Sequence, residues 1–136
     1  MARPRTTPAG LVEARARLAT AAAYHDVADL VLDEREQEGF LNVAAGLAVL
    51  AGIAAADAIC GARLGRFHRG SDHRDAAGLL AQATRDGAKL AAIFRRLIDL
   101  KDEAHYGVAS VSAVKAQNAV RWAGQLLSRA REEVER

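Results

Sequence analysis

The sequence predicts an all-α fold, an antiparallel bundle of four to five helices whose two N-terminal helices are long. Hydrophobic residues make up 51% of the chain and aromatic residues only 4%, and much of the hydrophobic share is alanine, the strongest helix former. Hydrophobic positions recur at helical spacing, and β-branched residues never alternate with polar ones as in a half-buried strand. A chain of 136 residues suits one domain, expected at residues 8–136 behind a flexible N-terminus of residues 1–7.

The first helix is expected to begin at Thr7-Pro8 and to run to about Gln37. The Thr7 hydroxyl can cap a helix, and proline suits the first helical position because its missing N–H would have no partner there. Gly39 is the first strong stop signal after that.

The second helix is expected from Phe40 to Leu64, with Gly65 closing it. It is apolar on nearly all sides, so other helices must cover it, and its alanines and glycines let neighbouring backbones come close. Asn42 and Asp57 interrupt the apolar run, and alanine and glycine partition poorly into lipid. We therefore expect a buried bundle helix and not a membrane span.

Three further helices follow the main loop, which is expected at residues 66–71. The third covers about residues 73–85, the fourth carries hydrophobic residues in i, i+3, i+4, i+7 order and ends at Gly107, and the fifth fills the C-terminal region. The expected caps are Ser71 or Asp72 for the third helix and Ser110 or Ser112 for the fifth.

Charge and cysteine content narrow the class of protein. A net charge of +2 is far from the strong bias of a dedicated nucleic-acid binder. The single Cys60 excludes an internal disulfide and a cysteine-built zinc site, and its apolar surroundings predict a buried thiol. The N-terminus has no apolar segment behind its arginines, unlike a signal peptide. A cytoplasmic protein is expected.

Histidines and acids gather around the main loop, at His68, Asp72, His73 and Asp75. A metal site needs three or four convergent ligands, whereas His73 and Asp75 are two positions apart and point to different sides of a helix. Asp72 and Asp75 also suit the first turn of a helix, where the dipole favours negative charge. Helix capping is the preferred interpretation, and no metal or cofactor is predicted.

Asp57 is the one acid in the otherwise uncharged second helix. An unpaired buried carboxylate is costly, so we expect a partner. Antiparallel packing brings residues 17–25 of the first helix to its level, and His73 is in range on the other side. A structural ion pair is the preferred interpretation, and a polar site residue is the alternative for Asp57 and His73.

The densest basic cluster surrounds the main loop. Arginines near a helix N-terminus can bind phosphate, although there is no glycine-rich phosphate loop here. A solvated basic loop is the preferred interpretation, and a nucleotide or phosphate site is the alternative. The candidate residues are Arg63, Arg66, Arg69 and Arg74.

The stretches LAVLAGIAAADAICGARLG and KDEAHYGVASVSAVKAQNAVRWAGQLLSRARE carry a resemblance to a known family. They resemble the HEPN superfamily, the higher-eukaryote and prokaryote nucleotide-binding domains. In ribonuclease members, an Arg and a His with four to six residues between them act on RNA in a cleft that a dimer forms, whereas only three residues separate position 101 from His105. Here Lys101 stands in place of the Arg, with His105 and Tyr106 after it. A lysine binds phosphate less well than a bidentate guanidinium, so the motif is interpreted as degenerate.

The resemblance implies a non-catalytic HEPN-like domain that forms a homodimer and binds a protein of nucleotidyltransferase or antitoxin type. The dimer interface is expected at the second helix or at residues 63–75, because an alanine-rich helix leaves apolar faces that a second copy can cover. The alternative is a metal-independent ribonuclease or a nucleotide-binding domain that uses Lys101, His105 and Tyr106.

Overall fold

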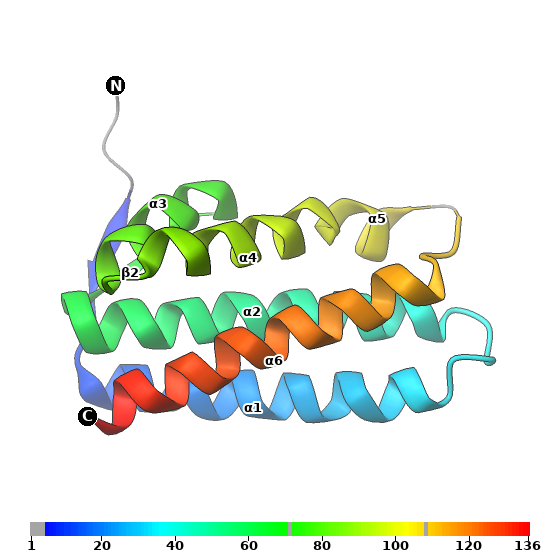
Figure 1. The fold of residues 1–136 in the computed structure, drawn as a ribbon, viewed down its shortest axis with the longest axis horizontal. Helices are drawn as coiled ribbons and strands as arrows, with labels where there is room; N and C mark the ends of the chain where they lie inside the picture. Colours follow the sequence, from blue (N-terminus) through cyan, green and yellow to red (C-terminus); the bar gives the residue numbers. More distant parts are fainter. Residues whose placement is uncertain (1–4, 71, 108) are drawn as a thin grey trace.

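The computed structural model describes residues 5–70, 72–107 and 109–136 and confirms the predicted all-α class (Figure 1). The structure has six helices and two short strands within these residues. The helices are α1 (Leu11–Asp33), α2 (Phe40–Leu64), α3 (His73–Ala83), α4 (Gly87–Asp99), α5 (Lys101–Tyr106) and α6 (Ala113–Glu135). The strands are β1 (Thr6–Pro8) and β2 (Arg66–His68), which pair antiparallel.

Helix α2 is the centre of the bundle. It packs against α1 on one side, α6 crosses it, and α3, α4 and α5 form a layer on the opposite side from α1 (Figure 1). Small residues make this packing possible: a Cβ at Gly52 would lie 2.6 Å from Leu97 Cδ1 of α4. The predicted bounds of α2 are confirmed, and glycines in the left-handed conformation flank both ends, Gly39 at φ 82° and Gly65 at φ 69°.

Within the described residues, α2 alone is long and apolar enough to cross a membrane. Its apolar window has a mean hydropathy of 2.1, but 72% of that window is buried inside the bundle. Neighbouring helices of the same chain therefore cover most of the apolar surface of α2, as they do for a core helix of a bundle.

The helix start expected at Thr7-Pro8 is wrong. Thr6–Pro8 is extended and pairs with β2, with Thr7 opposite Phe67, so Thr6 and Thr7 belong to a strand and not to a flexible segment. Proline tolerates this place because a two-stranded sheet has only edges. Helix α1 begins at Leu11 instead, where the Gly10 N–H donates to Glu13 Oε2 at 3.0 Å.

Other helix ends also differ from the expectation. Helix α1 ends at Asp33 and not near Gln37, because Glu34 leaves the helical conformation and Arg35 Nε donates to the Leu32 carbonyl at 3.1 Å. Helix α3 ends at Ala83, and the predicted fourth helix is divided at Leu100 into α4 and α5.

Two of the expected caps are confirmed. The Asp72 side chain accepts a hydrogen bond from Arg74 N at the start of α3, and the Ser112 hydroxyl accepts one from Lys115 N at the start of α6. Ser71, the alternative cap for α3, lies outside the described residues.

Candidate functional site: the open face of α2

One face of α2 is left partly uncovered by the other helices. Val43 is 49% exposed, and Leu47 and Leu50 are half-buried, at the i, i+4, i+7 spacing of one helix face. Together with Ala104 and His105 of α5, this face lines a pocket of about 280 Å³, which we call the α2 pocket.

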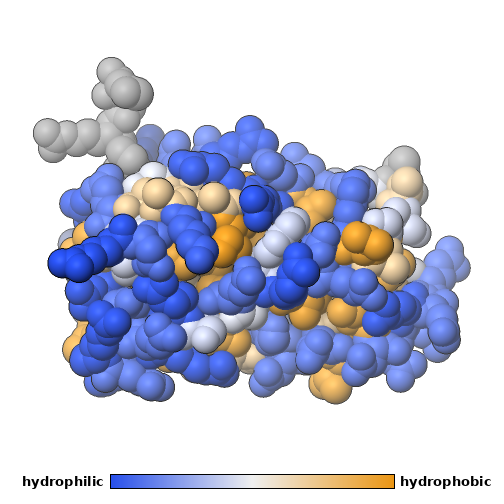
Figure 2. All heavy atoms as spheres, viewed as in Figure 1, coloured by the Kyte–Doolittle hydropathy of each residue, from blue (hydrophilic) through white to orange (hydrophobic). Residues whose placement is uncertain are grey.

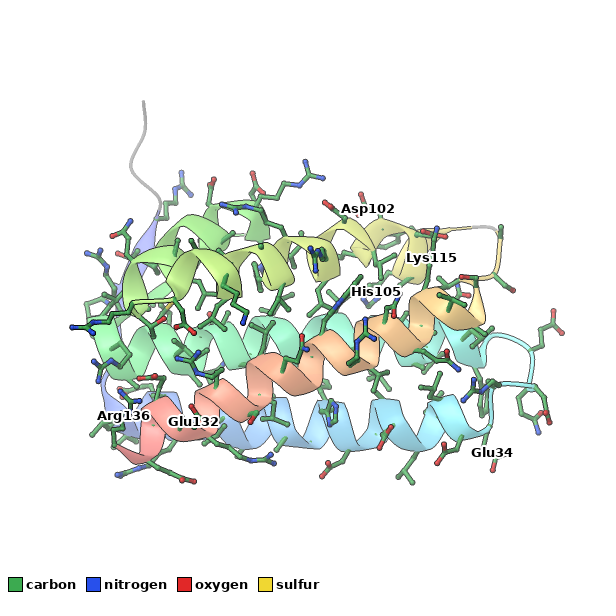
Figure 3. The ribbon with its side chains drawn as sticks, viewed as in Figure 1. Glu34, Asp102, His105, Lys115, Glu132 and Arg136 are labelled. Carbon is green, nitrogen blue, oxygen red and sulfur yellow. The ribbon has the colours of Figure 1, made fainter. Side chains whose placement is uncertain are left out.

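The imidazole of His105 lies in the α2 pocket because Gly46 of α2 has no side chain there. A Cβ at Gly46 would lie 3.1 Å from His105 Cε1, so the imidazole occupies space that a side chain would otherwise fill. Asn42 fixes the following loop, since its Oδ1 accepts a hydrogen bond from Val111 N at 2.9 Å. Figure 3 shows His105 projecting from α5 toward α2. His105 is an exposed residue, and among the described residues its contact with Gly46, and not a hydrogen bond to an acid, positions it.

The three residues of the degenerate motif have different surroundings. Lys101 is partly buried and lies one turn before His105 on α5, so the two share a helix side. Tyr106 is 75% exposed, and its ring centroid lies 6.0 Å from that of His105. The structure thus brings Lys101 and His105 toward one side of α5 and leaves Tyr106 in solvent.

His73 links α3 to this basic region. Burial lowers the pKa of His73, and the positive charges of Lys101 and His68 lower it further. The rings of His68 and His73 have centroids 6.0 Å apart. Burial and the nearby Lys101 of α5 and His68 of β2 therefore favour the neutral form of His73.

Asp57 has the partner that its position predicts. Arg17 Nε of α1 donates to Asp57 Oδ2 at 3.0 Å, within the segment expected from antiparallel packing. Burial nevertheless raises the pKa of Asp57, against the lowering effects of Arg17 and of the nearby His68. The alternative partner, His73, forms no hydrogen bond with Asp57 among the described residues.

The arginines expected to form a phosphate site turn toward different helices. Arg63 approaches Glu133 of α6 at 3.3 Å, and Arg74 approaches Asp99 of α4 at 3.7 Å. Arg66 is exposed on β2, and Arg69 is exposed just after the end of this strand. Two of the four guanidinium groups are therefore already paired with carboxylates, which compete with any phosphate.

A buried ion network at the end of α6 was missed in the sequence. Glu133 is only 3% exposed, although it lies in the charged run REEVER. Arg129 and Arg63 both approach it at 3.3 Å, and Arg129 also pairs with Asp86 before α4. The available signal was spacing: Glu133 lies seven positions after the buried Leu126, on the same side of the helix.

A second hollow lies between α4 and α6 and was also missed. Its volume is about 450 Å³, and the guanidinium of Arg96 lies 6.0 Å from the ring centroid of Trp122. Lys89 and Arg121 add positive charge, and no carboxylate lines this hollow within the described residues. Trp122 packs against the core with one part of its surface and lines this cationic hollow with another.

Among residues 5–70, 72–107 and 109–136, no three His, Cys, Asp or Glu side chains lie close enough together to hold a metal ion. No family model matches the chain, and no curated protein matches it.

Proposed function

We propose that this chain is a non-catalytic HEPN-like domain that acts by association, with a second copy of itself and with a protein of nucleotidyltransferase or antitoxin type. The distribution of exposed apolar side chains carries this proposal. Seven large hydrophobic side chains are exposed in the described part of the chain, and four of them lie on α1. Val43 and Tyr106 lie at the α2 pocket or next to it. Clustered apolar surface of this kind is typical of protein interfaces.

The surroundings of His105 support a non-catalytic role. A general base works best when a third group orients it, and His105 has no hydrogen-bond or ion-pair partner among the described side chains. Lys101 offers a compact ammonium where a phosphate would be better held by a guanidinium. Glu103, two positions before His105 on the same helix, pairs with Lys115 at 3.1 Å.

A metal-independent ribonuclease or nucleotide-binding domain is the second candidate. It is favoured by one observation: Lys101 and His105 share a side of α5 next to an open pocket, with the partly buried His73 close to Lys101. A cation and an imidazole in that order could neutralise phosphate charge and transfer a proton.

RNA cleavage separates the two candidates. We would incubate mixed RNA, without added metal, with the wild type, His105→Ala and the solvent-facing α6 control Gln117→Ala. The proposal expects no cleavage by any of them. Cleavage by the wild type and by Gln117→Ala that is lost in His105→Ala would overturn the non-catalytic assignment.

Light scattering at micromolar concentration tests association itself. The expected mass is that of two 14.4 kDa chains. A mass of one chain that does not change when the protein is concentrated would remove the homodimer from the proposal.

A further inference from the structure

The outer face of α1 carries an apolar stripe that no other described part of the chain covers. It lies opposite the buried face of this helix, where Ala14, Ala21 and Ala28 have no exposed surface. Leu30 is 67% exposed and Val12 is 77% exposed. Figure 2 shows apolar atoms interrupting the hydrophilic surface at the lower edge of the molecule, where α1 runs in Figure 1. The α1 stripe consists of Val12, Ala16, Ala19, Ala23, Val27 and Leu30.

The α1 stripe is nearly symmetrical about Ala21. If two copies of α1 run antiparallel with their stripes in contact and the midpoint at the level of residue 21, Val12 meets Leu30 of the second copy, and Ala19 meets Ala23 of the second copy. The small residues lie at the centre and the larger ones at the ends. Small side chains at the contact allow helix axes to approach to about 8 Å, so the two stripes fit each other over about 27 Å of helix.

The charged residues beside the α1 stripe are arranged so that opposite charges meet in the same antiparallel pairing. Arg15, Asp26 and Asp29 are exposed, and none of them forms an ion pair within the described chain. Asp26 and Asp29 follow Arg15 by about three and four turns, so all three flank the stripe on one side. The antiparallel pairing places Arg15 beside Asp26 and Asp29 of the second copy.

The acidic residues near the C-terminal end of α1 are poorly placed for an isolated helix. Asp29 and Asp33 lie near the C-terminal end of α1, where the helix dipole disfavours negative charge, and no basic residue occupies the last turn. An antiparallel second copy brings the N-terminal half of its α1, with Arg15, to this end. Pairing therefore compensates a charge pattern that the single chain leaves unfavourable.

We propose that α1 pairs antiparallel with α1 of a second copy, about a two-fold axis that passes between Ala19 and Ala23 of the stripe. This inference rests on the proposed self-association and assigns its surface to α1, not to α2 or to residues 63–75. The reason is that five helices of its own chain pack against α2 and leave only the face at the α2 pocket partly uncovered, whereas the α1 stripe has no cover within the described residues. The α2 pocket then stays open for the protein partner.

An apolar-to-charged substitution gives the first test. Leu30→Glu places a carboxylate in the paired stripe, and Val114→Glu is a matched control on α6, since the two side chains are 67% and 65% exposed. Light scattering across a dilution series should show a dimer affinity at least tenfold weaker for Leu30→Glu and an unchanged affinity for Val114→Glu. Circular dichroism checks that both variants remain helical.

Charge reversal gives a test that does not depend on the folding of Leu30→Glu. Arg15→Glu alone, and Asp26→Arg with Asp29→Arg, should each weaken the dimer, because like charges then face each other. The chain with all three substitutions should recover the wild-type dissociation constant. Arg131→Glu, at an exposed arginine on α6, is the control and should leave the dimer unchanged.

Disulfide trapping reports the register. An equal mixture of Ala19→Cys and Ala23→Cys chains should oxidise to a cross-linked dimer faster than either chain alone. The native Cys60 adds little background, because it is 3% exposed and burial raises its pKa to about 12.

The outcomes of these experiments distinguish the failure of self-association from the failure of the α1 interface. A wild type that is monomeric at all concentrations would overturn self-association and this pairing together. A wild-type dimer that withstands Leu30→Glu and both charge reversals would overturn the α1 interface alone. Recovery by the triple variant, together with a cross-link between positions 19 and 23 in the mixture, would support the antiparallel register.

Discussion

Asp57 and Glu133 are both largely enclosed carboxylates, and they differ in how many cations surround them. The Asp57 side chain is 18% exposed and has one arginine, Arg17, with burial still raising its pKa. The Glu133 side chain is 2% exposed and is approached by Arg63 and Arg129 at 3.3 Å and by Arg136 at 3.9 Å. A buried charge is tolerated when its surroundings compensate it, and only Glu133 is surrounded in this way.

Because of this difference, Glu133 has a structural role, whereas Asp57 can change its protonation state more easily. Glu133 and Arg129 connect the end of α6 to α2 and, through Asp86, to the start of α4, so they hold three helices together. Asp57 lies near His68, and burial favours its neutral form by raising its pKa. Removing an arginine should therefore be costly at Glu133 and moderate at Asp57.

Arg129→Ala should give the largest effect. It leaves Glu133 buried with fewer cations and removes the partner of Asp86, and breaking a buried pair costs about 3 kcal/mol of unfolding free energy. Urea unfolding followed by circular dichroism measures it, with Arg131→Ala as the exposed control on the same helix. A loss no greater than that of the control would mean that Glu133 needs no compensation.

Arg17→Ala should cost less, roughly 1.5 kcal/mol at neutral pH, the typical value of a hydrogen bond to a charged group. Because the folded-state pKa of Asp57 is already raised, protonation of Asp57 favours the folded state. The loss should therefore shrink as the pH falls through that pKa. Arg17→Ala combined with Asp57→Asn should recover most of the loss, and no recovery would show that Arg17 acts through packing alone.

Acid titration of Asp86 should give the smallest effect. The hydrogen bond from Arg129 lowers the pKa of Asp86 to about 2 from an ordinary value of 3.8. A lowered folded-state pKa contributes stability that is fully present above 3.8 and is lost as the pH falls toward about 2. Asp86→Asn should remove this part of the acid-induced loss in urea midpoint, and an unchanged pH profile would contradict the pairing.

The same pair of acids shows what sequence reasoning can find. Asp57 was detectable because it is the single acid in an apolar helix, and antiparallel packing of adjacent helices located Arg17. Glu133 was missed because it lies among exposed charges, where one buried position looks like its neighbours. A solvated basic loop was the preferred interpretation of the Arg63 to Arg74 cluster, and the pairing of Arg63 with Glu133 and of Arg74 with Asp99 was not predicted.

The seating of His105 was likewise invisible in the sequence. Residues 46 and 105 belong to different helices, and only their packing places an imidazole over a glycine. The residue types around LKDEAHYGV suggested a helix end with a degenerate motif, but not a pocket on α2. Local spacing reports which residues share a helix face, and it does not report which other helix that face meets.

The sequence by itself determined the helical class and the bounds of α2, and it restricted the caps of α3 and α6 to two candidates each, of which Asp72 and Ser112 are confirmed. These features depend on alanine content, helical periodicity, flanking glycines and side chains within three residues. Only the tertiary structure decided that Thr6–Pro8 is a strand and that Glu133 is buried. Both results depend on contacts between segments about 60 or more residues apart, such as Thr7 with Phe67 and Arg63 with Glu133. Such contacts form only when the bundle closes, so no local pattern encodes them.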